Sequence, residues 1–128
     1  YGAHNVVVAS DIDAIKKLKK SFDYLFFTGH AFKGKWGLFM NTLKPKGRLH
    51  FLGLLPEPLN ITMFHMLRGQ NSVSASPVGG PEAMKKMVEF CARHNIIPEV
   101  EFFKMSEINE AIAHLKSGKA RYRIVLEN

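Results

Sequence analysis

The stretch "KGRLHFLGLLPEP", residues 46–58, decides the fold because it is typical of a buried strand that stops abruptly. A turn containing Gly47 leads into an apolar run. Gly53 interrupts that run between leucines, and Pro56 and Pro58 follow at once. A glycine flanked by leucines at a strand end predicts a surface against which something flat and partly apolar can lie.

Strand-like and helix-like segments alternate on both sides of this stretch. Runs of β-branched, aromatic and other apolar residues predict strands at residues 6–10, 22–28, 48–54 and 72–76. Segments with helical apolar spacing separate them, and the helix that begins at Pro81 carries a stripe of Met84, Met87, Val88 and Cys91. This alternation predicts an α/β fold with a parallel sheet, and the continuous apolar run at 22–28 predicts a strand covered on both faces. A strand, a helix capped by Ser106 and a last strand follow residue 98 and predict a small separate layer.

The composition narrows the classes of function. The 128 residues suit one domain with a hydrophobic core, and no apolar run approaches the ~20 residues that span a bilayer. The single cysteine, Cys91, excludes an internal disulfide and fits a cytoplasmic setting. A formal net charge of +7 fits either an acidic partner or simply a basic surface. The absence of a long apolar run argues against a membrane. Because aromatic residues are not interleaved with the basic ones, the sequence disfavours a nucleic-acid partner.

Three successive strand ends carry glycine or proline: "FFTGH", "FLGLLP" and "SASPVGGP". Parallel sheets bind ligands beyond the carboxyl ends of their strands, so the three ends predict a ligand-binding edge, although ordinary turns would also contain these residues. Cys91 and His94 share a helix face, but no second pair accompanies them, so we expect no metal site. Arg121 and Arg123 alternate along the last strand, either as surface charges or as partners of a phosphate.

The segments "GAHNVVVAS", "SFDYLFFT", "LKPKGRLHFLGL", "SASPVGG", "MVEFCARHNIIPEVE" and "INEAIAHLKSGKARYRIVLEN" occur in this order along nearly the whole chain. Together they resemble the carboxy-terminal half of zinc-dependent medium-chain alcohol dehydrogenases, and especially the NADP-using cinnamyl-alcohol-dehydrogenase-like aldehyde reductases. The resemblance implies a partial Rossmann domain at 1–98 without its first two strands, and a segment at 99–128 that returns to the catalytic domain. Residues 6–9 would then lack their neighbours in the sheet, so we expect residues 1–10 to be displaced, disordered or paired with another chain.

The resemblance also implies which residues bind a cofactor. The nicotinamide ring and its ribose would lie among Thr28, Gly29, Leu52, Gly53, Leu54, Ser76, Pro77 and Val78, with main-chain groups reading the carboxamide. Arg123, or Arg121 after a small shift in register, would reach the phosphate side. The cofactor would be NADP, with NAD as the alternative.

The same resemblance implies an oxidoreductase that transfers hydride between nicotinamide and a small alcohol or aldehyde. Zinc would be bound only in the intact enzyme, because this chain holds neither its ligands nor catalytic residues, and the chain by itself is expected to be an inactive cofactor-binding fragment. Two subunits would join through the strand at 72–76 into a homodimer. The alternative functions are a stand-alone basic α/β module that binds nucleic acid and a dimerisation piece.

Overall fold

The computed structural model describes residues 2–29 and 34–128, and the chain divides after Val78 into two compact units. The domain boundary expected from the sequence lies between residues 98 and 99. It is inferred from the family resemblance, and it stays a prediction. Within the described part of the chain, no helix combines the length and the apolar character needed to cross a bilayer.

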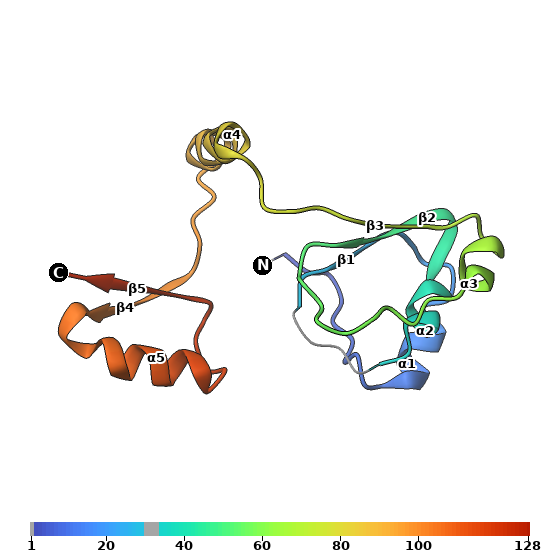
Figure 1. Ribbon diagram of the computed structural model, residues 1–128, viewed down its shortest axis with the longest axis horizontal. Coiled ribbons are helices and arrows are strands. Elements are labelled where there is room, and N and C mark those ends of the chain that lie inside the picture. Colours follow the sequence, from blue (N-terminus) through green and yellow to red (C-terminus); the bar gives the residue numbers. More distant parts are fainter. Residues whose placement is uncertain (1, 30–33) are drawn as a thin grey trace. The chain divides into compact units, whose positions relative to one another are not determined.

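The first unit is a parallel three-stranded sheet with helices on one side (Figure 1). Its strands are β1 (Phe22–Phe27), β2 (Leu43–Phe51) and β3 (Ser72–Ala75), in the order β1-β2-β3. Its helices are α1 (Ile12–Lys17), α2 (Trp36–Met40) and α3 (Met63–Leu67). Each helix connects two strands or leads into one, which confirms the predicted α/β class with a parallel sheet.

The core of this unit lies between α2 and the sheet. Trp36, Met40, Leu43, Leu49 and Phe51 are buried there. The rings of Phe27, Trp36 and Phe51 meet with centroids 5.1–5.6 Å apart, so one aromatic cluster joins β1, α2 and β2.

The opposite face of the sheet is open within this unit. Tyr24 and Phe26 are exposed there and stack on each other with ring centroids 6.1 Å apart. The expectation that the strand at 22–28 is covered on both faces is therefore wrong for this unit, because α1, α2 and α3 lie on one side only (Figure 1).

Residues 6–10 form no strand, although their composition is strand-like. They lie outside the three-stranded sheet, and Val6 and Val8 are 87% and 66% exposed. β-Propensity depends on a neighbouring strand with which to pair, and this segment has none in the described part of the chain. The expected displacement from the sheet is confirmed.

β2 begins earlier than predicted, at Leu43 rather than Arg48, and ends at Phe51. The pairing with β1 shifts between Phe22 and Tyr24, so residues 44–47 bulge out of the ladder. Lys46 takes a positive φ of 63° in this bulge, and its N–H donates to the carbonyl of Gly69. The early stop leaves Leu52 and Gly53 just beyond the strand.

The chain segments after β1 and β2 touch backbone to backbone. A Cβ built on Gly53 would lie 1.8 Å from the carbonyl oxygen of Gly29 and 3.1 Å from the carbonyl carbon of Thr28. Only glycine therefore fits at position 53, because a neighbouring backbone cannot rotate away as a side chain can.

The second unit begins with α4 (Pro81–Arg93), which has Gly80 as N-cap and buries no residue. The predicted stripe is present but lies open: Met84, Met87 and Val88 are exposed and Cys91 is half-buried. β4 (Val100–Lys104) and β5 (Arg123–Glu127) form a parallel two-stranded sheet joined by α5 (Ile108–Lys116). A 3-10 turn at Met105–Glu107 precedes α5, so Ser106 lies inside that turn and Glu107, rather than Ser106, occupies the N-cap.

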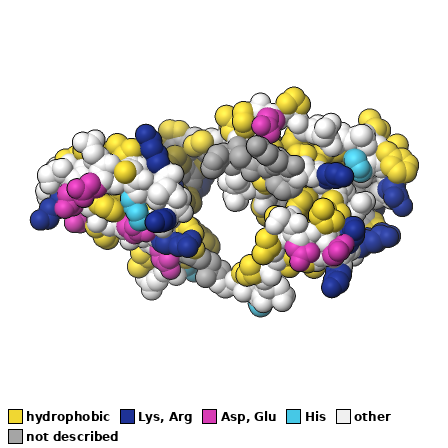
Figure 2. Space-filling view, turned by 90° about the horizontal axis from the view of Figure 1, so that it is seen from below, with side chains coloured by type: hydrophobic (Ala, Val, Ile, Leu, Met, Phe, Trp, Pro, Cys, Tyr) yellow, Lys and Arg dark blue, Asp and Glu magenta, His cyan; other side chains and the backbone are white. Residues whose placement is uncertain are grey.

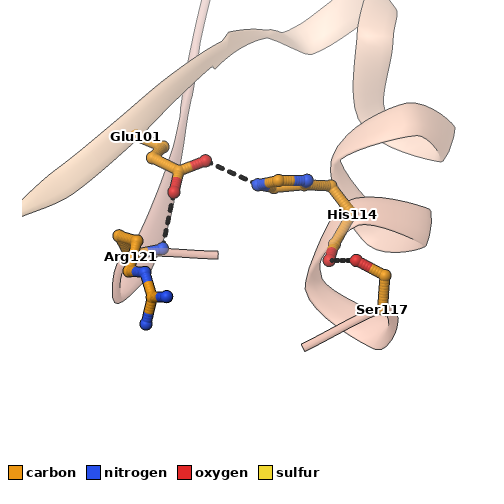
Figure 3. Close-up of polar contacts among 4 residues, drawn as sticks. All are labelled: Glu101, His114, Ser117 and Arg121. Atoms are coloured by element: carbon orange, nitrogen blue, oxygen red, sulfur yellow. Dashed lines mark hydrogen bonds and ion pairs between the residues drawn. The ribbon is translucent and has the colours of Figure 1, made fainter. Parts of the chain in front are cut away.

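Glu101 on β4 links this strand to α5 and to the segment that precedes β5 (Figure 3). One carboxylate oxygen lies 2.7 Å from Nε2 of His114 on α5, and the other accepts the backbone N–H of Arg121 before β5. The hydrogen bond from Arg121, followed by the contact with His114, lowers the pKa of Glu101 below its ordinary value of 4.5.

Substituting Gly53 by alanine is expected to destabilise the first unit. The added methyl group meets the backbone at Gly29, so β1 or β2 must shift, at a cost of about 1–3 kcal/mol. Leu54→Ala is the matched control, because this neighbouring side chain is 86% exposed. Urea unfolding followed by the fluorescence of Trp36 measures both variants, and equal midpoints for Gly53→Ala and Leu54→Ala would contradict the account.

The second unit is expected to lose stability in acid through Glu101. Because the folded state lowers the pKa of this carboxyl, the ionised group favours folding above the ordinary pKa of 4.5, and this contribution disappears as the pH falls through the folded value. Melting temperatures of the wild type and of Glu101→Gln should therefore differ at pH 7 and converge as the pH falls below the lowered pKa of Glu101. Glu99→Gln, an exposed carboxylate nearby, is the control, and a gap for Glu101→Gln that is unchanged with pH would refute the role of the charge.

Candidate functional site

The carboxyl ends of the three parallel strands lie level with one another. The register pairs Phe27 with Phe51 and Phe51 with Ala75, which are the last residues of β1, β2 and β3. The residues that follow each strand therefore meet at one edge of the sheet. Eight of the nine residues predicted from the sequence follow these strand ends: Thr28, Gly29, Leu52, Gly53, Leu54, Ser76, Pro77 and Val78. Contacts of the backbone hold Thr28, Gly29, Leu52, Gly53 and Ser76 directly at the edge.

Backbone hydrogen bonds hold this edge beyond the regular ladder. The carbonyl of Phe27 accepts the N–H groups of both Leu52 and Gly53, at 2.9 and 3.2 Å. The carbonyl of Phe51 accepts the N–H of Ser76 at 3.2 Å. These three donors serve the sheet itself, whereas the N–H groups of Leu54 and Val78 have no hydrogen-bond partner among the described residues. Leu54 and Val78 thus offer the main-chain donors that a ligand could use.

The side chains at this edge are mostly apolar and open. Leu52, Leu54 and Val78 are 54%, 86% and 87% exposed, and Thr28, Ser76 and Pro77 are exposed beside them. Exposed apolar side chains that gather at one place often mark a binding surface. Together with the close approach of Gly29 and Gly53, they form a platform that suits a flat, partly apolar group.

A histidine that the sequence did not single out lies behind this edge. Nδ1 of His50 is 2.8 Å from the hydroxyl of Ser74, and Nε2 is 2.9 Å from the hydroxyl of Ser76. The side chain of His50 thereby fixes Ser76 at the site and links it to β3. The sequence pattern that indicates this contact is the alternation of serines at 72, 74 and 76. It places polar side chains on one face of β3, beside His50 on β2.

The ninth predicted residue, Arg123, lies at the first position of β5 in the second unit and is exposed. Arg121 is also exposed, and its guanidinium lies 5.8 Å from the ring centroid of Tyr122. A role for either arginine at the phosphate of a ligand stays a prediction.

The side chains do not fit a metal site. Among the described residues, no three of His, Cys, Asp and Glu come close enough together to hold an ion. His94, which shares a helix face with Cys91, instead packs against Phe90 with ring centroids 4.3 Å apart. The chemistry that these residues support at the strand ends is binding and orientation.

Comparison with known proteins places this geometry in context. No family model matches the chain. An aldehyde reductase, AdhA, from Synechocystis sp. is 47% identical over 99% of this chain, and cinnamyl alcohol dehydrogenase 3 from Arabidopsis thaliana is 36% identical over 98%. The matches cover 38% and 33% of those two proteins, so the chain spans about a third of the length of these curated relatives.

Solved structures agree with the sequence relatives. A cinnamyl alcohol dehydrogenase from Sorghum bicolor superposes with a TM-score of 0.89 at 26% identity, over 98% of this chain and 35% of that protein. A cinnamyl alcohol dehydrogenase from Helicobacter pylori, solved in complex with NADP(H), gives a TM-score of 0.69 at 27% identity, over 88% of this chain and 33% of that protein. The matches confirm the family resemblance and the Rossmann-like fold expected from the sequence, and the chain is a homologue of the cinnamyl alcohol dehydrogenases and of aldehyde reductase AdhA over about a third of their length.

Proposed function

We propose that this chain is the nicotinamide-binding part of an NADP(H)-linked alcohol dehydrogenase or aldehyde reductase. The observation that carries the proposal is the level edge at which Gly29 and Gly53 touch and at which Leu52, Leu54 and Val78 lie exposed. In the intact enzyme, hydride would pass between the nicotinamide and a small alcohol or aldehyde. The names of the relatives, which are aldehyde reductases and cinnamyl alcohol dehydrogenases, support this class of reaction.

The residues at the edge would contact different parts of the nicotinamide and its ribose. Leucine and valine side chains would pack on one face of the ring and exclude water from it. The N–H groups of Leu54 and Val78, which have no partner in the described part of the chain, are the candidates to bind the carboxamide oxygen and so fix the orientation of the ring. The hydroxyl of Ser76, held by His50, would lie near the ribose.

We propose NADP as the cofactor, since the homologous enzyme from Helicobacter pylori was solved with NADP(H), and NAD is the alternative. A catalytic zinc, if the intact enzyme uses one, would be bound outside the described residues, because they contain no suitable group of ligands. The single cysteine supports a cytoplasmic setting.

The isolated chain is expected to bind NADPH only weakly. The sequence has no Gly-x-Gly-x-x-Gly loop to hold the pyrophosphate, so we expect a Kd in the millimolar range or weaker, about 4 kcal/mol of binding free energy at most. Amide shifts in an NMR titration should concentrate at residues 28–29, 52–54 and 76–78. Leu54→Asp should abolish them, whereas Leu67→Asp, an equally drastic change at an exposed leucine on α3, should leave them intact. Micromolar binding, or equal effects of the two variants, would contradict the proposal.

We further propose that two copies of the intact protein join through β3. This strand is the last in the order β1-β2-β3, and within the described residues its outer edge pairs with no other strand. Because the N–H of Ser76 faces β2, alternation along the strand turns the N–H groups of Val73 and Ala75 toward the open edge. No proline or lysine protects residues 72–76 from pairing with a second copy.

Ala75→Pro is expected to convert the intact dimer into a monomer. Proline removes a hydrogen-bond donor that faces outward, and a two-fold axis repeats the loss in both subunits. Sedimentation should show half the mass, while circular dichroism should stay nearly unchanged because no bond to β2 is lost. Ala75→Ser keeps the donor and should remain dimeric. A wild-type monomer at tens of micromolar, or an Ala75→Pro dimer, would show that β3 is not the interface.

A further inference from the structure

The amino-terminal edge of the sheet, opposite the proposed nicotinamide site, holds a cavity of about 340 Å³. The ends of α1, α2 and α3 and the beginning of β2 line it. All of its ionisable lining residues are basic: Lys16, Lys19, Lys20, His65 and Arg68. Figure 2 shows Lys and Arg side chains gathered on this unit, at its right-hand side.

Most of this positive charge has no partner. Lys16 is 3.0 Å from Asp13 and so is offset, but Lys19, Lys20 and Arg68 form no ion pair with any described residue. The carboxyl ends of the three helices attract cations, and this is an alternative reason for basic residues at this edge. Each helix end supplies at most about half a negative charge, so three helix ends leave the three free cations of the cavity with a net positive charge.

The ring of the histidine in the lining has a fixed orientation. Nδ1 of His65 accepts the backbone N–H of Thr62 at 3.1 Å, so in the neutral ring the hydrogen sits on Nε2. A Cβ on Gly37 would come within 2.3 Å of this Nε2, which means that glycine at 37 makes room for the ring. His65 is half-buried and therefore less free to turn than the lysines around it.

We propose that this cavity binds a small phosphate-bearing molecule that is distinct from the nicotinamide cofactor. Its volume lies at the lower end of small-molecule sites, which suits a diphosphate or a small phosphorylated metabolite. Phosphate oxygens accept hydrogen bonds from guanidinium and ammonium groups, and the lining supplies both, from Arg68 and from the lysines. No acidic lining residue opposes the anion.

The test is a titration of the chain with inorganic pyrophosphate at low ionic strength, followed by amide shifts. We expect saturable binding, with shifts at residues 19–20 and 68–69. Lys19→Gln and Arg68→Gln should each weaken binding at least fivefold. Arg68→Lys, which keeps the charge, and Lys85→Gln, which removes an equal charge from α4, should stay within about twofold.

Three results would overturn the proposal. Lys85→Gln could weaken binding as much as Lys19→Gln, which would indicate only a general attraction to a basic protein. Pyrophosphate could fail to saturate. NADP⁺ could displace pyrophosphate competitively, which would assign the cavity to the cofactor rather than to a second ligand. The use of both Lys19→Gln and Arg68→Gln keeps the test valid if the loss of the Arg68 contact with the Phe64 ring, 5.5 Å away, weakens α3.

Discussion

Three aromatic rings beneath the carboxyl end of the sheet hold the first unit together. Phe27, Trp36 and Phe51 come from β1, α2 and β2, and their mutual packing fixes two strands and the helix between them. Above this cluster the backbones at Gly29 and Gly53 touch, because no side chain separates them. Phe51 also accepts the N–H of Ser76, so β3 is held at the same level. The level edge, and hence the proposed site, depends on this packing.

Because the strands are parallel, the two edges of the sheet carry different side chains and suit different ligands. In a parallel sheet all carboxyl ends lie at one edge, and the carboxyl ends of the connecting helices lie at the other. Here the first edge exposes Leu52, Leu54 and Val78, and the N–H groups of Leu54 and Val78 have no partner within residues 2–29 and 34–128. The second edge collects lysines and an arginine, which complement the partial negative charge of helix ends but exceed it. A flat, partly apolar ligand suits the first edge and an anion suits the second.

Much of this arrangement was readable from local sequence patterns. The glycines and prolines after three apolar runs predicted where each strand ends, and parallel topology then brings those ends together. Other features depend on contacts between distant residues. β2 starts at Leu43 because a bulge at Lys46 is held by the carbonyl of Gly69, which no local pattern reveals.

The predictions that differ from the structure share a physical cause. They concern segments whose structure depends on another segment with which to pair or pack. Residues 6–10 have strand-like composition but find no neighbouring strand among the described residues, and they lie outside the sheet. The apolar run at 22–28 predicted a strand covered on both faces, yet the face with Tyr24 and Phe26 is open. Apolar composition alone does not determine which element covers a strand. The bridge from His50 to Ser74 and Ser76 requires the register of β2 and β3, which the sequence does not specify by itself.

The central claim is that the nicotinamide ring lies on the leucine and valine platform at the carboxyl edge. The most direct measurement is of intermolecular nuclear Overhauser effects between the nicotinamide ring protons of NADP⁺ and the methyl groups of the isotope-labelled protein. The account predicts cross-peaks to the methyl groups of Leu54 and Val78, and their loss when the adenosine half of the cofactor is offered alone. Cross-peaks confined to methyl groups elsewhere, such as Ile15 or Leu67, would contradict it.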